Sequence, residues 1–199
     1  MPAPELQSPR LILRHWIPAD RVPFALMNSD PEVMRYFPSV LSTDQSDLYA
    51  ETVQLGLEER EFGFWAIEVR SADQDQGLFI GFAGLSVPQW NATFTPCLDI
   101  GWRLGRDYWG MGYASEAAHR ILDYGFNQLD IEEVLSFASV LNARSIAVME
   151  RLGMIRNSED DFVPPMFDPD SDLSRHVLYR MPKQLWMSLQ SDQVMPAED

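Results

Sequence analysis

The fold is decided by residues 98–125, which begin Leu98-Asp99-Ile100-Gly101-Trp102-Arg103-Leu104, pass through Trp109-Gly110-Met111-Gly112-Tyr113-Ala114 and continue from Ser115 to Gly125. Apolar residues alternate with other residues over 98–104, as expected of a strand with one buried face. Small and apolar residues recur at helical spacing over 114–125. This stretch therefore predicts a strand, a glycine-containing turn and a helix in immediate succession.

The turn between strand and helix has the properties of an anion-binding cradle. Gly110 and Gly112 lack a Cβ, so the backbone there can bring several N–H groups close to a ligand. The start of the following helix adds roughly half a positive charge at the same place. A phosphate or pyrophosphate is the ligand that such a junction favours.

Two familiar glycine motifs do not fit this turn. A Walker motif requires Lys-Ser or Lys-Thr after the glycines, and none follows. A dinucleotide fingerprint requires a third glycine where this chain has Ser115, and an acid at the end of the next strand, which here reads Val140-Leu141-Asn142. A purely structural turn remains the alternative.

A second stretch adds a family resemblance. Residues 134–140 read as another strand, and Asn142-Ala143-Arg144-Ser145 opens a helix that ends at Leu152-Gly153. The motifs Trp-Gly-x-Gly-Tyr-Ala-x-Glu and Asn-x-x-Ser-x-x-x-Met-Glu-Arg-Leu-Gly-Met resemble the GNAT superfamily of acetyl-CoA-dependent N-acetyltransferases. Residues 8–14 and 30–36 resemble its RimJ/RimL branch, the ribosomal-protein N-terminal acetyltransferases. The resemblance spans residues 6–182.

The resemblance implies an α/β (α+β) GNAT fold. Its sheet would be mixed, mostly antiparallel and twisted, with about seven strands flanked by about four helices and a splay between the fourth and fifth strands. We expect strands over 11–16, 62–70, 78–85, 98–104, 134–140, 154–156 and 175–181. We expect helices over 20–27, 42–59, 114–125 and 142–152, with a polar turn at 73–77. Residues 1–182 would form one domain, and 183–199 a partly disordered C-terminal extension.

Composition narrows the functional class. The net charge of −15 opposes nucleic-acid binding and suits a cationic acceptor such as an amine. No apolar run approaches the roughly twenty residues of a membrane span. The single Cys97 excludes an intrachain disulfide and argues against a cysteine zinc cluster. We therefore expect a cytoplasmic enzyme, monomer or homodimer, without metal, nucleic acid or membrane as a partner.

Transfer of an acetyl group from a thioester to an amine sets definite demands. A lysine-type amine is neutral only about once in a few thousand molecules at pH 7, so a carboxylate must take its proton directly or through water. Direct attack on acetyl-CoA needs no nucleophilic residue. The acceptor would be a protein N-terminal α-amine or a small-molecule amine. The alternative is a non-catalytic sensor of the same fold that binds coenzyme A.

The resemblance also assigns coenzyme-binding residues. The backbone of the turn would bind the pyrophosphate, and Leu104 would run beside the pantetheine arm. Asn142 occupies a coenzyme-contacting position, or it is simply a helix N-cap. Arg144, Arg106 and Arg120 are the available cations for the ribose phosphate. The expected coenzyme-binding set is Leu104, Trp109, Gly110, Met111, Gly112, Tyr113, Ala114, Asn142 and Arg144.

Two residues are assigned to catalysis. Asp99 lies on the polar face of the fourth strand, where relatives carry a general base; the alternative is a solvated or salt-bridged acid. Glu68 is a weaker substitute on a neighbouring strand. Many relatives place a Tyr acid where this chain has Met149, so Ser145 is the replacement, unless it only supports the first turn of its helix.

Histidines, aromatic residues and one acidic segment each allow two interpretations. His176 either lines the acceptor site or is a hydrogen-bonded structural residue, and His119 is expected at the surface. The aromatic residues Trp65, Trp90 and Tyr108 either wall an acceptor pocket or belong to the core. The acidic, proline-containing segment 157–174 reads as an exposed loop that either attracts a cationic acceptor or is merely solvated.

Overall fold

A computed structural model describes residues 1–70 and 77–194. Within them one eight-stranded sheet runs in the order β1-β2-β3-β4-β5-β6-β8-β7. The strands are β1 Leu6–Gln7, β2 Leu11–Arg14, β3 Phe64–Val69, β4 Leu78–Ser86, β5 Asp99–Leu104, β6 Glu133–Ser139, β7 Ile155–Arg156 and β8 His176–Pro182. The helices are α1 Arg21–Ser29, α2 Thr43–Glu59, α3 Tyr113–Asn127, α4 Ala143–Arg151 and α5 Lys183–Val194, with 3₁₀ turns at Pro18–Asp20, Arg106–Tyr108 and Ser158–Asp160.

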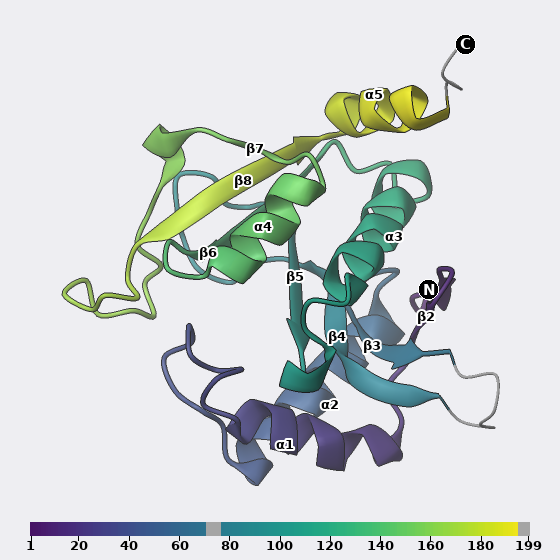
Figure 1. The fold of residues 1–199 in the computed structure, drawn as a ribbon, viewed down its shortest axis with the longest axis vertical. Helices are drawn as coiled ribbons and strands as arrows, with labels where there is room; N and C mark the ends of the chain where they lie inside the picture. Colours follow the sequence, from purple (N-terminus) through teal and green to yellow (C-terminus); the bar gives the residue numbers. More distant parts are fainter. Residues whose placement is uncertain (71–76, 195–199) are drawn as a thin grey trace.

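Helices cover both faces of the sheet. Helices α1 and α2 lie on one side of the central strands, and α3 and α4 lie on the other (Figure 1). Neighbouring strands are antiparallel except for β5 and β6, which run parallel. The mixed, mostly antiparallel sheet predicted from the sequence is confirmed.

Several local predictions hold for simple chemical reasons. Ser42 and Gln45 form a reciprocal capping box, in which the Ser42 hydroxyl accepts from the Gln45 amide at 3.2 Å. Gly153 ends α4 with a φ of 79°, the left-handed conformation that glycine adopts without strain. Strands β3 and β4 pair as an antiparallel hairpin, while residues 73–76 of the predicted turn lie outside the described residues.

Two elements differ from the sequence-based expectation. Asp20 does not cap α1, because its carboxylate is buried and paired with Arg14, with Oδ2 2.7 Å from Nη1. An additional strand, β1, pairs with β2 and brings the sheet to eight strands. Two residues are too few for a periodic signal, so β1 could be recognised only from its partner.

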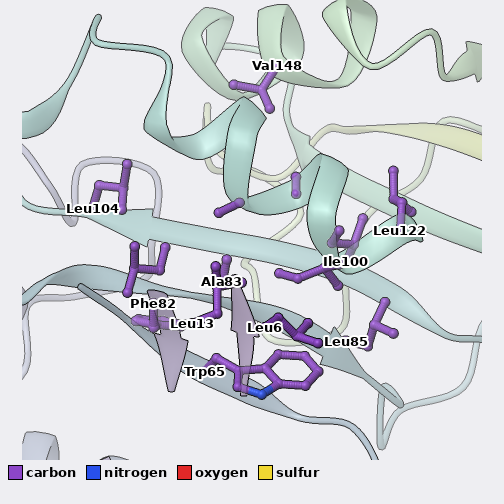
Figure 2. Close-up of a cluster of buried hydrophobic side chains, with 14 of the residues drawn as sticks. Leu6, Leu13, Trp65, Phe82, Ala83, Leu85, Ile100, Leu104, Leu122 and Val148 are labelled. Atoms are coloured by element: carbon purple, nitrogen blue, oxygen red, sulfur yellow. The ribbon is translucent and has the colours of Figure 1, made fainter. Parts of the chain in front are cut away.

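The core lies between the sheet and its covering helices. Ile100 and Leu85 come from neighbouring strands, and Leu122 comes from α3 above them (Figure 2). Trp65 is fully buried, with its Nε1 donating to the Pro4 carbonyl at 2.8 Å. The core interpretation of Trp65 is therefore correct, and it does not wall an acceptor pocket.

The C-terminal extension begins with helix α5. Residues 183–194 form this helix, and 195–199 lie outside the described residues. Trp186 is 1% exposed, with its ring 5.8 Å from that of Phe126 and 4.7 Å from that of His119. Leu185, Met187 and Leu189 of the same helix are partly buried against the core, so α5 packs on the domain through several apolar side chains.

We predict that Trp186→Ala lowers the free energy of unfolding by about 3–5 kcal/mol, because truncating a buried indole removes apolar contacts and leaves a cavity. Urea unfolding followed by circular dichroism measures the change. Gln184→Ala, at an exposed position of the same helix, is the matched control. A loss below about 0.5 kcal/mol for the Trp186 variant would show that α5 is not part of the domain.

Candidate active site

The site lies where β5 and β6 separate. The two parallel strands are in register only at Asp99 and Leu135, where the Leu135 amide donates to the Leu98 carbonyl at 2.9 Å. The Ser136 hydroxyl then donates to the Ile100 carbonyl at 3.0 Å, in place of the next backbone bond. Beyond this point the strands splay, as predicted, and carbonyl and amide groups of β5 are left for another partner.

Two cavities meet at this splay. The larger, about 580 Å³, lies between the 32–37 loop, the end of β5, the start of α3 and α4. The smaller, about 200 Å³, lies beside Asp99, β6 and His176. Six residues line both, and they mark the passage from one cavity to the other: Tyr36, Phe37, Trp102, Arg103, Asn142 and Ser145.

The glycine turn forms one wall of the larger cavity. Gly110 and Gly112 have φ angles of 74° and 81°, both in the left-handed region. Within the described part of the chain, the amides of residues 110–115 have no protein acceptor, whereas the next amide, that of Glu116, donates to the Gly112 carbonyl. Six backbone donors therefore remain free at the start of a fifteen-residue helix. This is the chemistry of a diphosphate site.

The N-terminal segment holds this turn in place. Glu116 Oε1 accepts from the Ser8 hydroxyl at 2.7 Å and from the Arg10 amide at 2.8 Å. The Arg10 guanidinium pairs with the other Glu116 oxygen at 2.6 Å and donates to the Met111 carbonyl at 3.0 Å. Burial opposes ionisation, but these donors hold the pKa of Glu116 below its ordinary value. The Ser-Pro-Arg motif thus has a structural role at the site.

Arginines are distributed unequally around the larger cavity. Arg144 lines it, stacked over the Trp109 ring at 4.4 Å, and the Trp109 Nε1 donates to the Leu104 carbonyl at 2.9 Å. Arg151, which sequence reasoning missed, also lines it and donates to the Ser115 hydroxyl at 2.7 Å. Arg151 follows Arg144 by seven residues, or two helical turns, so the two side chains share one face of the helix. This spacing could have identified Arg151 from the sequence.

The two other predicted cations lie outside the cavity lining. Arg106 Nε is 3.9 Å from an Asp30 oxygen. Arg120 pairs with Asp123 at 2.9 Å on the exposed side of α3. Neither lines the larger cavity, whereas Arg144 and Arg151 line it beside the glycine turn and Arg103 lines it at the passage to the smaller cavity.

Asp99 is buried at the inner end of the smaller cavity. It is 8% exposed, and its Oδ1 accepts a hydrogen bond from the Ser86 hydroxyl at 2.7 Å. It forms no ion pair within the described residues, so the solvated and salt-bridged interpretations are wrong. Burial raises the pKa of Asp99 from its ordinary 3.8 to about 6, and the Ser86 hydrogen bond only partly offsets this. A carboxylate with such a pKa is suited to exchange a proton near neutral pH.

Helix α4 presents Asn142 and Ser145 at the passage between the cavities. Asn142 is the N-cap, with its side-chain oxygen accepting from the Ser145 amide at 3.2 Å, and it lines both cavities. No hydrogen bond from the Ser145 hydroxyl occurs among the residues described. Met149 is completely buried and lines neither cavity, so its side chain belongs to the core.

Glu68 is a structural residue, whereas His176 is both hydrogen-bonded and part of a cavity wall. Glu68 pairs with Arg14 Nε at 2.5 Å and lines none of the cavities, so it is excluded as a base. His176 is buried, with Nδ1 3.1 Å from the Ser174 carbonyl, and it lines the smaller cavity; burial lowers its pKa. His119 is half-buried against Trp186 instead of lying at the surface.

The acidic segment 157–174 contributes an aromatic residue to the smaller cavity. Phe167 lines it next to His176, with the rings 4.9 Å apart. Two of its acids are neutralised within the chain, because Asp160 pairs with Arg180 at 2.9 Å and Asp161 with Arg156 at 2.6 Å. Trp90 packs on Phe162 of the same segment, while Tyr108 lines the larger cavity.

Comparison with known proteins agrees with this geometry. Residues 10–155 match the family described as "Acetyltransferase (GNAT) domain", and the chain belongs to this family of acetyltransferases. It is 34% identical over 131 residues to the uncharacterized protein YkkB of Bacillus subtilis (strain 168), covering 66% of this chain and 73% of that protein. It is 32% identical over 163 residues to the uncharacterized N-acetyltransferase p20 of Bacillus licheniformis, covering 77% and 86%.

Solved structures share the fold. The GNAT-family acetyltransferase from Bacillus anthracis superposes with a TM-score of 0.73 at 21% identity, covering 91% of this chain and 99% of that one. GNAT acetyltransferases use acetyl-CoA as the acetyl donor. The described ranges contain neither a cluster of three metal-ligating side chains nor a helix long and apolar enough to cross a membrane.

The raised pKa of Asp99 predicts a pH-dependent effect on stability. The folded state favours the protonated acid, so its contribution is complete below about pH 4 and is lost as pH rises through 6. Asp99→Asn should therefore leave stability unchanged near pH 4 and increase it by at most roughly 3 kcal/mol at pH 8. Thermal and urea unfolding at both pH values measure this.

Asp172→Asn, at an exposed loop acid, is the control and should show no such pH-dependent gain. If the Asp99 variant were equally or less stable than the wild type at pH 8, the buried carboxylate would not be destabilising.

Proposed function

We propose that the chain binds acetyl-CoA in the larger cavity and transfers its acetyl group to a primary amine that enters from the smaller one. The observation that carries this proposal is the row of six free amides at 110–115, which faces the larger cavity with Arg144 and Arg151 nearby. The amides would hold the diphosphate, and the arginines are the cations available to the ribose phosphate.

The rest of the cavity fits the remainder of coenzyme A. Trp102, Leu104 and Trp109 supply an apolar wall between the amides and the passage to the smaller cavity. A pantetheine arm laid along this wall would meet the unpaired backbone groups of β5, where the strands splay. Its thioester would then lie at the passage, beside Asn142 and Ser145.

The chemistry follows from the groups around the passage. The amine nitrogen attacks the thioester carbonyl carbon, a C–N bond forms and the C–S bond breaks. Asp99, directly or through water, takes the proton that the ammonium must lose to become the attacking amine. The departing thiolate receives a proton, for which the Ser145 hydroxyl is the nearest candidate on α4. Backbone donors of β5 would stabilise the oxyanion.

We also propose the branch of the family to which the chain belongs and the kind of amine that it acetylates. Residues 8–14 and 30–36 support the RimJ/RimL branch, since the first motif anchors the cradle and Glu32, Val33 and Tyr36 line the larger cavity. The acceptor would be a protein N-terminal α-amine or a small amine. One competing possibility is a coenzyme-A sensor without turnover, because Met149, a buried core residue, stands where many relatives carry a tyrosine acid.

Calorimetry and thiol release separate these possibilities. Acetyl-CoA and free CoA should bind, and CoA thiol should be released with at least one member of a panel of small amines and N-terminal peptides. Binding without release for any member would favour the sensor. Absence of heat with either form of the coenzyme would remove the proposal altogether.

We predict that Ala114→Pro weakens CoA binding roughly 10- to 100-fold, because it removes one amide donor to a charged phosphate. Proline is tolerated in the first turn of a helix, as Pro23 is in α1, so the fold should persist. Calorimetry with free CoA measures the affinity. Thr43→Pro, at the first position of α2, is the matched control and should bind CoA like the wild type.

We predict that Asp99→Asn lowers kcat/KM for the amine roughly 10²- to 10⁴-fold while leaving the affinity for acetyl-CoA unchanged. In the wild type, kcat/KM should rise with pH through a limb with an apparent pKa near 6, in addition to the titration of the amine itself. The limb near 6 should be absent in the variant. A wild-type profile that follows only the amine would reject Asp99 as the base.

A further inference from the structure

Arg103 is a partly buried cation at the passage between the two cavities, and its Nε atom is buried. It lies on β5 four residues from Asp99, on the same face of the strand, and it lines both cavities. Its guanidinium is packed among aromatic rings, with Cζ 4.1 Å from the Phe37 centroid and 5.3 Å from that of Phe82. The position is therefore largely shielded from water.

Arg103 has no acidic partner. Among the described residues no carboxylate lies within 4.0 Å of it, and its one hydrogen bond runs from Nη1 to the Asn28 side-chain oxygen at 2.7 Å. Its Nε is buried without a partner. An arginine remains protonated under these conditions, so the chain keeps an uncompensated positive charge at this point.

The lack of a partner is not explained by a shortage of acids. The chain has 30 Asp and Glu against 15 Lys and Arg. Two other partly buried arginines take two carboxylates each: Arg14 pairs with Asp20 and Glu68, and Arg180 pairs with Asp160 and Glu133. Aromatic rings offset only part of the desolvation of a buried cation. Arg103 thus differs in kind from the structural arginines of the same chain.

The free edge of the guanidinium indicates the ligand. With Nη1 directed to Asn28, the Nε and Nη2 donors remain side by side. Two parallel N–H donors match the two oxygens of a carboxylate and give a bidentate pair. The smaller cavity therefore has a carboxylate, Asp99, suited to an amine, and a cation, Arg103, suited to an anion.

We propose that the acceptor is an amine that also carries a carboxylate, and that Arg103 binds this carboxylate while the amine lies toward Asp99. This inference rests on the proposed acetyl transfer and specifies its substrate class. It narrows the amine acceptor suggested by the net charge to an amine that also carries an anionic group. A free amino acid and a peptide N-terminus followed by an acidic residue share this chemistry.

The decisive experiment compares matched acceptors. Amino acids and ω-amino acids of increasing length are assayed beside their carboxamides, and N-terminal peptides with Asp or Glu at the second position beside the Asn or Gln forms. Thiol release gives kcat/KM for each. We expect the carboxylate form of the best pair to be favoured at least tenfold, and the two series show whether a free amino acid or a peptide is the source.

Arg103 variants assign the preference to this side chain. Arg103→Met, similar in volume but uncharged, should lower kcat/KM roughly 10- to 100-fold for the carboxylate acceptor and less than threefold for its carboxamide. Arg103→Lys should keep part of the preference, which guards against a fold defect in the Met variant. A merely structural arginine would affect both members of each pair equally.

The outcomes separate this inference from the proposed function. Turnover with amines in which carboxylate and carboxamide are equivalent, or in which diamines are preferred, overturns the inference and leaves acetyl transfer intact. If no amine is turned over, calorimetry with N-acetylated amino acids and their amides in the presence of CoA still tests whether the site binds a carboxylate. Stronger binding of the acid, lost in Arg103→Met, supports the carboxylate site, and equal binding rejects it.

Discussion

The separation of β5 from β6 is the constraint on which the rest of the molecule depends. Two parallel strands that pair at one residue each leave backbone groups without partners in the middle of a sheet, which a folded protein tolerates only where something else can use them. Ser136 supplies one hydrogen bond to Ile100 and thereby fixes where the divergence begins. Both cavities, and every side chain assigned a role in them, are arranged around that opening.

The cradle beside the opening depends on contacts between distant parts of the chain. Gly110 and Gly112 allow the turn to leave its amides free, but the turn is positioned by Glu116, which receives donors from Ser8 and Arg10 about a hundred residues earlier. A carboxylate near the start of a helix is also favoured by the helix dipole. The same ion pair therefore stabilises α3, attaches the N-terminal segment and leaves the six donors directed at the cavity.

The charges of the chain divide into two groups. Most partly buried charges are paired, as in the Arg14 and Arg180 clusters, where each guanidinium meets two acids. Asp99 and Arg103 are the exceptions on one strand, since neither has an oppositely charged partner among the described residues. Charged groups that lower the stability of the fold and have no partner in it are characteristic of functional sites, because the substrate completes their interactions.

The sequence by itself determined those elements whose conformation depends on neighbouring residues. The alternation over 98–104, the two glycines and the helical spacing of small residues establish the strand, turn and helix, because backbone conformation and one-sided burial are properties of neighbouring residues. The tertiary structure alone decided the rest. Burial of Asp99 under Ser86, isolation of Arg103 among aromatic rings and docking of Trp186 each depend on residues far away in the chain. Charge and burial are set by what packs nearby, and a pattern of neighbouring residues does not contain that information.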